Sequence, residues 1–415
     1  MIDIEGLKRE FDDCECGREH TTLLKEVCMG SGITCDTGEI LKKNGFGKKL
    51  LLVADKNTLA AAEGIEDSLA AFDLRKKIYE NLREATLAEV EKIKDILKDC
   101  DAVISVGTGS LNDICRKAAA DLFKPLSIFA TAASMDGFAS YNAPLTDGRF
   151  KVTYPAKTPE VIIADTRILA AAPAFLKSAG FGDMVGKYVG LIDWQVSHII
   201  TGEYYCEKVA ALTRSAADRI MSLADRVTAE DEESAGKVFE ALLLTGIGMS
   251  FTKTSRPASG TEHILSHYWE CKKLLEGKLS DFHGRKVGVA TLSIMDLYGK
   301  LRDKKSVKAH KDKTDWEEVY ADYGPLADEV RKLNTPSTIT EGIEPALIEK
   351  SWEKIREIIA SVPTKDEILA AMKKAGCPTE HGEVLVSDEL YRSGLKFHPY
   401  MRNRMSLRRL CAMFD

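Results

Sequence analysis

Two histidines four residues apart are the first side chains in this sequence that could hold a metal. They are His263 and His267, in the stretch 261–270, TEHILSHYWE, of a chain with only eight histidines. Side chains at this spacing share one face of a helix, where two imidazoles can hold one ion. Two histidines packed against Trp269 in a core would show the same spacing, so the pattern leaves both interpretations open.

A second group of metal-binding residue types lies near the N-terminus. The segment 14–20, CECGREH, offers Cys14, Cys16 and His20, with Cys28 and Cys35 not far along the chain. These residues predict either a structural zinc site or free thiols in a reducing cytosol. The single residue between Cys14 and Cys16 differs from the two residues of most zinc knuckles, and no second knuckle follows.

A glycine-rich turn follows an apolar run in the segment 103–119, VISVGTGSLNDICRKAA. Free N–H groups and the dipole at the start of the following helix favour a phosphate or pyrophosphate. The turn does not complete the G-x-G-x-x-G fingerprint, because Asn112 occupies the third glycine position. A tight turn with an Asn or Asp cap is therefore the alternative. The expected dinucleotide contacts here are Gly107, Thr108, Gly109, Ser110 and Asp113.

Asp55 ends another apolar run, in the segment 50–58, LLLVADKNT. A carboxylate at the end of a strand can accept hydrogen bonds from ribose hydroxyls. It can equally cap a helix that starts near Asn57. Together with the glycine turn, Asp55 indicates a dinucleotide lying across the carboxyl ends of parallel strands.

The elements that would position these residues change in character along the chain. From residue 48 to about 165, apolar runs of strand length alternate with helical patterns, at 48–55, 71–80, 101–109, 126–132 and 161–165. Such runs are typical of strands buried on both faces of a parallel sheet. After Pro173 the pattern is helical. We predict an α/β domain over 1–172 and an all-α domain over 173–415.

Composition narrows the class of protein. A chain of 415 residues exceeds what one core usually supports, and 44% hydrophobic with 29% charged residues predicts a globular fold. The formal net charge of −6 argues against a nucleic-acid partner. The start, MIDIEGLKREFDD, does not resemble a signal peptide, and no apolar run reaches the roughly 20 residues needed to cross a bilayer. A cytoplasmic protein without a membrane span is expected.

Six ordered stretches resemble one known family. They are VGTGSLND, ATAASMDGFASYNAPL, YPAKTPEVIIADTRIL, AGFGDMVGKYVGLIDW, SRPASGTEHILSHYWE and HGRKVGVATL, between residues 106 and 292. Together they resemble the glycerol-1-phosphate dehydrogenase family, in the superfamily of iron-type alcohol dehydrogenases, glycerol dehydrogenase and dehydroquinate synthase. CECGREH and VCMGSGI resemble its bacterial branch. The residues after about 305 match less clearly, and their basic, amphipathic tail, 398–415, is expected either to close the helical domain or to contact a partner.

The resemblance implies a dehydroquinate-synthase-like fold: an α/β nucleotide-binding domain, an all-α domain, and a cleft between them for NAD or NADP and one divalent metal. The implied metal ligands are Asp183, His263 and His283. One carboxylate and two imidazoles suit catalytic zinc, and nickel or iron would also accept them. Without the resemblance, Asp183 would be interpreted as the cap of a helix starting at Met184.

The implied reaction is reduction of dihydroxyacetone phosphate to sn-glycerol 1-phosphate. His267 would then face the substrate or relay a proton, or be a packing histidine. Asp136 would contact substrate hydroxyls, or only form a turn before Gly137. Thr131 and Ser134 would line the nicotinamide side, and Lys187 and Arg256 are candidates to bind the substrate phosphate.

Three alternatives compete with this reaction. The fold could serve another polyol or sugar-phosphate dehydrogenase, a dehydroquinate-synthase-like lyase, or a non-catalytic binding protein. The lyases usually have a glutamate as the acidic ligand and a Gly-Gly-Lys shortly after the substrate aspartate. Asp183 and the segment 136–144, DGFASYNAP, favour the dehydrogenase. Cofactor preference stays open, since Asp55 would repel a 2′-phosphate but members use both nucleotides. Many members are homodimers, and no stretch identifies an interface.

Overall fold

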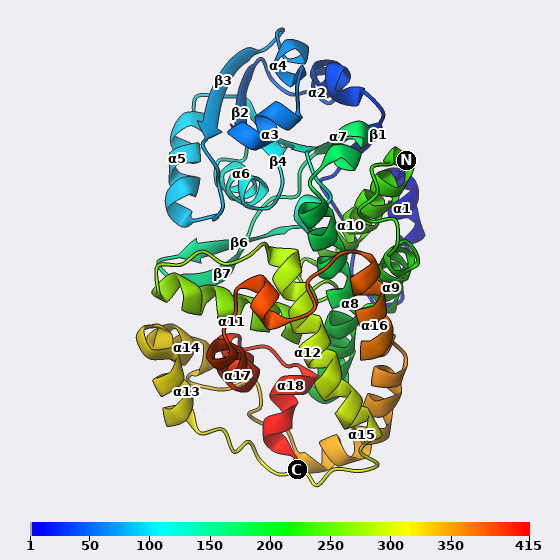
Figure 1. Cartoon of the computed structure of the whole chain (residues 1–415), viewed down its shortest axis with the longest axis vertical. Coiled ribbons are helices and arrows are strands. Elements are labelled where there is room, and N and C mark those ends of the chain that lie inside the picture. Colours follow the sequence, from blue (N-terminus) through cyan, green and yellow to red (C-terminus); the bar gives the residue numbers. More distant parts are fainter. Residues whose placement is uncertain (1) are drawn as a thin grey trace.

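A six-stranded parallel sheet organises the first half of the chain (Figure 1). The computed structural model describes residues 2–415. β2, β4, β5 and β8 are buried along almost their whole length, so their continuous apolar runs follow from helices covering both faces. The strands are β1 (Glu26–Gly30), β2 (Lys49–Asp55), β3 (Asp73–Tyr79), β4 (Ala102–Gly107), β5 (Leu126–Ala130) and β8 (Val161–Asp165).

The strand order β1-β8-β5-β4-β2-β3 reverses direction beside β2. The chain leaves β2 for β3 on one side and returns to β4 on the other side. Connections therefore diverge at the carboxyl ends of β2 and β4, which is where open parallel sheets bind ligands. Asp55 ends β2 and Gly107 ends β4, so the fold brings these two residues to one edge.

Short helices connect and cover these strands. α5 packs beside α6, whose start follows β4 directly. The helices of this half are α2 (Thr37–Lys43), α3 (Lys56–Ala61), α4 (Ile65–Ser68), α5 (Leu87–Leu97), α6 (Gly109–Asp121) and α7 (Thr166–Ala171).

An antiparallel hairpin, β6 (Asn142–Asp147) with β7 (Phe150–Pro155), lies between the sheet and the helical half (Figure 1). The sequence analysis did not predict it. Gly148 and Arg149 form its two-residue turn between the paired Asp147 and Phe150, and Gly148 has a φ of 61°, the positive value that a type II′ hairpin turn requires at its first central position. Gly148, followed by the alternating apolar and polar residues 150–154, was the signal that could have found the hairpin.

The second half is built from helices, which confirms the predicted fold class. α8 runs through its centre and contacts α9, α12 and α15. None of the helices within residues 2–415 is both long and apolar enough to span a bilayer. The helices are α8 (Ala174–Thr201), α9 (Glu207–Ser222), α10 (Glu232–Thr252), α11 (Thr261–Leu275), α12 (His283–Asp303), α13 (Trp316–Tyr323), α14 (Ala327–Asn334), α15 (Pro345–Ala360), α16 (Lys365–Lys374), α17 (Asp388–Phe397) and α18 (Leu407–Leu410).

Both ends of the chain pack onto this helical half. The N-terminal arm, residues 2–25 with α1 (Ile4–Glu10), lies against α9 and α10 (Figure 1), and Phe11 contacts Phe251 with ring centroids 4.9 Å apart. At the other end, Leu407 and Leu410 are fully buried, so the tail closes the helical half. The arm thus belongs to the first predicted domain in sequence but packs on the second half; the boundary at 172/173 stays a prediction.

Candidate metal and nucleotide site

A cavity of about 720 Å³ opens between the carboxyl ends of the strands and the helical half. Residues from both halves line it, as expected for an interdomain cleft. Predicted site residues on its walls are Asp55, Thr108, Gly109, Ser110, Asp113, Thr131, Ser134, Asp136, His263, His267 and His283.

Three predicted metal ligands meet at the helical side of this cavity, where His263 and His283 line the wall and Asp183 is buried behind them. One ligand atom from each of Asp183, His263 and His283 lies within 4.8 Å of the other two. Asp183 is fully buried within α8, so the alternative that it caps a helix beginning at Met184 is wrong. An ionised carboxylate and two imidazole nitrogens form a donor set that fits one divalent metal with room for a further ligand.

Close packing of α8 against α12 brings two of these ligands together. A Cβ added to Gly182 would lie 2.3 Å from the carbonyl oxygen of Gly284, and one added to Gly284 would lie 1.9 Å from that of Ala179. Only glycine allows backbones to approach this closely. Because Asp183 and His283 each adjoin one of these glycines, the contact between the helices sets the spacing of the ligands.

Lys187 neutralises a pair of buried aspartates beside the metal ligands. Its Nζ lies 2.8 Å from both Asp183 Oδ1 and Asp136 Oδ2, and the Asp136 amide donates to Asp183 Oδ2 over 2.9 Å. Burial alone would raise the pKa of Asp183, but the attraction of Lys187 overcomes it and holds the pKa well below its usual value. Burial and the charge of Asp183 together raise the pKa of Asp136. Asp183 is therefore ionised and ready to bind a cation.

Glu262, which the sequence analysis did not single out, orients His263. Glu262 Oε1 lies 2.5 Å from His263 Nδ1 and accepts from the Gly260 amide over 2.9 Å, while His263 Nε2 faces Asp183 at 3.4 Å. Burial lowers the pKa of His263, but hydrogen bonds to Asp183 and Glu262 raise it to about 9. Surroundings that favour a proton on Nε2 also favour a metal cation there. The signal was present in sequence as the acidic neighbour of a candidate ligand.

His267 lies in the cavity, beside the metal group. Its ring stacks on that of His283 with centroids 5.6 Å apart, and its buried Nε2 has no hydrogen-bond partner. Burial lowers the pKa of His267 well below its usual value, so the ring is neutral. An unpaired buried nitrogen is costly unless a ligand binds it. The placement favours a role in the site over simple packing.

The turn between β4 and α6 provides the phosphate-binding geometry. Gly107 and Gly109 have φ values of 154° and 35°, and a Cβ on Gly107 would lie 2.5 Å from Leu111 Cδ1. Thr108, the N-cap of α6, makes no side-chain bond to the helix; its hydroxyl instead lies 2.9 Å from that of Ser134. The amide groups at the start of α6 therefore have no side-chain cap, and the turn fits a pyrophosphate.

Asp55 caps the helix that follows β2, as the alternative interpretation predicted, and it also lines the cavity. Its Oδ1 accepts from the Thr58 amide over 2.9 Å in a capping box at the start of α3.

Asp113, one turn into α6, pairs with Arg116 at 2.8 Å. Burial raises the pKa of Asp113 to about 6 despite that partner. Thr131 lies on the wall beyond β5.

The structure does not place the two predicted phosphate-binding cations on the cavity wall. Arg256 donates to Glu203 Oε1 over 2.7 Å and to the Met405 carbonyl over 2.8 Å, and it is buried away from the cavity lining. Lys187 is fully buried between its two aspartates. Both side chains form ion pairs inside the protein. Contrary to the prediction, they do not face the place where a substrate phosphate would bind.

Two other lysines supply positive charge to the cavity. Lys151 on β7 and Lys286 on α12 lie 3.0 and 3.1 Å from the two oxygens of Glu270. Burial would raise the pKa of Glu270, but these lysines hold it well below its usual value. One carboxylate between two ammonium groups leaves one positive charge on this wall, near His267 and His283. Lys151 was not predicted from the sequence, because the hairpin that carries it was not predicted.

Comparisons with known proteins identify the family to which this chain is similar. Residues 28–173 match the family model described as iron-containing alcohol dehydrogenase. The chain is 31% identical to the glycerol-1-phosphate dehydrogenase [NAD(P)+] of Halalkalibacterium halodurans, over 97% of this chain and 96% of that one. It is 32% identical to the enzyme of the same description from Pyrococcus furiosus, over 78% and 87%.

Solved structures share the two-part fold. Sulfoacetaldehyde reductase from Bifidobacterium kashiwanohense, solved in complex with NAD+, superposes with a TM-score of 0.62 at 14% identity, over 95% of this chain and 96% of that one. At this identity the likeness establishes the fold alone.

Proposed function

The chain belongs to the glycerol-1-phosphate dehydrogenase family, and on that premise we propose that it catalyses the NAD(P)-dependent, metal-assisted reduction of dihydroxyacetone phosphate to sn-glycerol 1-phosphate. The observation that carries the proposal is the meeting of Asp183, His263 and His283 beside a cavity that the β4–α6 turn also lines. A metal-binding group and a phosphate-binding turn share one enclosed space.

Different residues would hold the metal and bind the nucleotide in such a reaction. When bound, the metal would polarise the substrate carbonyl and the reduced nicotinamide would supply the hydride. Asp183, His263 and His283 would hold the metal, and Lys187 keeps Asp183 ionised. The amide groups at the start of α6 would bind the pyrophosphate.

We assign proton transfer to His267. Its neutral ring carries one N–H donor and one acceptor nitrogen, and its buried Nε2 lacks a partner. It can therefore pass a proton from water to the substrate oxygen after hydride transfer. Asp136, held by Lys187 at 2.8 Å, would accept a hydrogen bond from a substrate hydroxyl.

We assign phosphate recognition to Lys286 and Lys151. Their net positive charge with Glu270 lies beside His267 and His283, which face the expected position of the carbonyl. A phosphate ester placed there would exchange water for two ammonium groups. This assignment replaces Lys187 and Arg256.

NADH oxidation with dihydroxyacetone phosphate tests the function. Turnover that a chelator abolishes supports it, whereas nucleotide binding without turnover contradicts it. In Lys286→Ala, Lys151 still neutralises Glu270, so the variant should fold. We expect KM for dihydroxyacetone phosphate to rise roughly 10- to 100-fold, as for loss of one charged hydrogen bond of about 1.5–3 kcal/mol.

Unphosphorylated dihydroxyacetone separates phosphate binding from general damage. Its kcat/KM should change little in Lys286→Ala, and the exposed Lys278→Ala should behave as wild type with both substrates. Equal losses for the two ketones would remove the phosphate role from Lys286.

Two further features remain proposals. We place the enzyme in the cytoplasm, because none of the ten cysteines forms a disulfide, as expected in a reducing compartment. We also propose a homodimer, by analogy with the family.

A further inference from the structure

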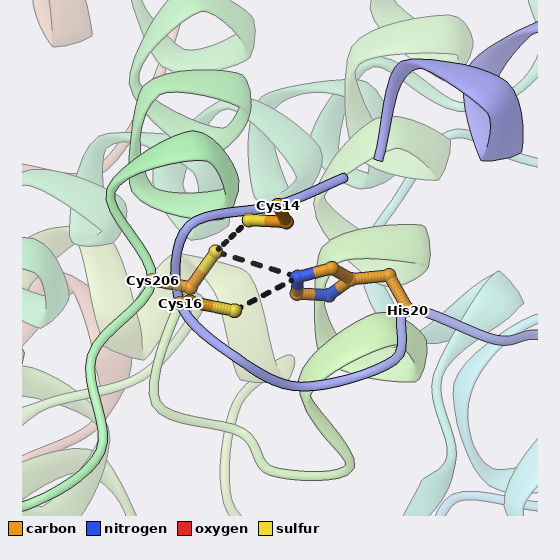
Figure 2. A group of neighbouring side chains, drawn as sticks. All are labelled: Cys14, Cys16, His20 and Cys206. Carbon is orange, nitrogen blue, oxygen red and sulfur yellow. Dashed lines mark hydrogen bonds between the residues drawn. The ribbon is translucent and has the colours of Figure 1, made fainter. Parts of the chain in front are cut away.

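Four metal-binding side chains converge at a place remote from the cavity. Cys14, Cys16 and His20 come from the N-terminal arm, and Cys206 lies at the N-cap of α9, 186 positions beyond His20 (Figure 2). One ligand atom from each lies within 4.8 Å of the others. None of the four lines the interdomain cavity. Cys206, which the sequence analysis did not connect with this group, supplies the missing fourth ligand.

The distances match the edges of a small tetrahedron. Cys14 Sγ lies 3.6 Å from Cys206 Sγ, and His20 Nε2 lies 3.6 Å from Cys206 Sγ and 3.1 Å from Cys16 Sγ. Zinc bonds of about 2.3 Å to sulfur and about 2.05 Å to nitrogen require tetrahedral edges of about 3.8 Å and about 3.6 Å. A disulfide needs sulfur atoms about 2.05 Å apart, so no two cysteines are joined here.

We propose that Cys14, Cys16, His20 and Cys206 form a closed structural zinc site. Three sulfurs and one imidazole complete the tetrahedral shell and leave no open position for a substrate. Such a site differs in ligand type from the Asp183 group, which contains no sulfur.

The surroundings suit a bound ion. His20 is buried between Phe11 and Phe251, with ring centroids 5.0 and 5.8 Å away, so its ring is held in place beside the cysteines. Three thiolates around a dication carry one net negative charge. The positive end of α9 points at Cys206, and Lys208 follows in its first turn, so both offset that charge.

Nearby polar groups orient the cysteines. The Tyr204 hydroxyl lies 3.3 Å from Cys16 Sγ, and the Arg18 guanidinium stacks 3.7 Å from the centre of the Tyr204 ring. Hydrogen bonds of this kind fix the ligands of metal sites.

The site would fasten the N-terminal arm to the helical half. The arm leads directly into β1, the edge strand that pairs with β8, so a clamp at Cys206 connects the sheet to α9. The arm is otherwise held by buried apolar side chains such as Phe11 and Leu24, and by bonds from Lys208 to the Glu10 carbonyl, from Lys253 to the Thr21 carbonyl and from Ser250 to the Thr22 hydroxyl. Bound zinc would therefore stabilise the whole chain against unfolding without taking part in catalysis.

Cobalt loading of the wild-type protein tests the proposal without any mutation. Co²⁺ bound by thiolates gives an intense sulfur-to-cobalt absorption in the near ultraviolet, which the sulfur-free Asp183 group cannot produce. We expect this band, and its loss when Zn²⁺ is added. Absence of the band from cobalt-loaded protein, or a Cys14–Cys206 disulfide in freshly purified protein, would overturn the site.

Zinc content of variants separates the two metal groups. We expect two metal ions per chain in wild type, one in Cys206→Ser and one in His263→Ala, with the cobalt band lost only from Cys206→Ser. Cys35→Ser is the matched control, because Cys35 is exposed and outside the cluster. If Cys206→Ser keeps both the zinc content and the cobalt band of wild type, the proposal is wrong. If the protein lacked dehydrogenase activity but bound zinc as proposed, the cobalt band would still appear. Failure of the proposed function can therefore be told apart from failure of the zinc site.

Discussion

At the scale of single residues, the candidate site depends on charges that balance one another in a buried space. Lys187 forms ion pairs with Asp183 and Asp136, Glu262 bonds to His263, and Glu270 pairs with both Lys151 and Lys286. A buried charge left without its partner costs several kcal/mol, so each of these contacts constrains its neighbours. The ligands of a metal can therefore be disturbed by residues that never touch it.

Glu262→Gln tests this dependence directly. The amide keeps the shape of the side chain but holds His263 Nδ1 less firmly, since it is uncharged. We expect metal affinity at the Asp183 group to fall roughly 10- to 100-fold, and activity with it. Competition with a chromophoric chelator measures the affinity.

Glu276→Gln, at the exposed end of the same helix, controls for the change of charge. Unchanged affinity in Glu262→Gln would show that His263 needs no support from Glu262.

At the scale of elements, the glycine contact between α8 and α12 sets the ligand geometry. Asp183 and His283 belong to different helices, and their separation depends on backbones that touch at Gly182 and Gly284. The β6–β7 hairpin acts similarly nearby, where it brings Lys151 to Glu270 on α11. The elements thus define the site as much as its side chains do.

Gly284→Ala should separate the helices without altering a ligand. The new methyl would lie 1.9 Å from the Ala179 carbonyl oxygen, so the backbone must move. We expect a stability loss of about 1–3 kcal/mol or more from overpacking, together with weaker metal binding. Urea unfolding and metal titration measure the two effects.

Gly299→Ala, on the same helix with open space around its position, is the control. It should raise stability by about 0.5–1 kcal/mol and leave metal binding unchanged. Normal metal affinity in Gly284→Ala would contradict the role of the contact.

At the scale of the whole molecule, the C-terminal segment closes the helical half around buried polar groups. His398 is fully buried at the start of a short 3₁₀ helix (His398–Met401), with Nδ1 2.6 Å from the Gly394 carbonyl. Burial, with the nearby charge of Arg408, lowers its pKa to about 3. The ring is therefore neutral in the folded state near neutral pH.

His398 should make the fold sensitive to acid. An unfolded histidine has a pKa of about 6.5, so between about pH 6.5 and about pH 3 the unfolded chain binds a proton that the folded chain does not. The resulting loss of unfolding free energy is absent above this window and reaches about 2 kcal/mol at about pH 5. His398→Asn removes this titration, and its side-chain amide can still donate to the Gly394 carbonyl. Between neutral pH and about pH 5, the unfolding free energy of the variant should therefore fall by about 2 kcal/mol less than that of wild type.

Denaturant unfolding at the two pH values measures this difference. His198→Asn, at an exposed position, should retain the pH dependence of wild type. Parallel behaviour of His398→Asn and wild type would assign the acid sensitivity to other groups.

The sequence by itself determined the local features of this protein. Continuous apolar runs predicted the buried parallel strands, and the segment 103–119 predicted the strand, turn and helix that form β4 and α6. These features depend on backbone preferences and burial over a few neighbouring residues, which a short stretch of sequence contains. Resemblance to a family added Asp183, His263 and His283, which the fold brings together.

Only the tertiary structure decided which distant residues meet. It turned Arg256 towards Glu203, enclosed Lys187 between two aspartates, placed Lys151 in the cavity and brought Cys206 to within 3.6 Å of Cys14. Residue type alone could not separate these outcomes, because a lysine or cysteine suits several surroundings. The choice is made by the packing of whole helices and of the hairpin, whose contacts connect segments far apart in the chain.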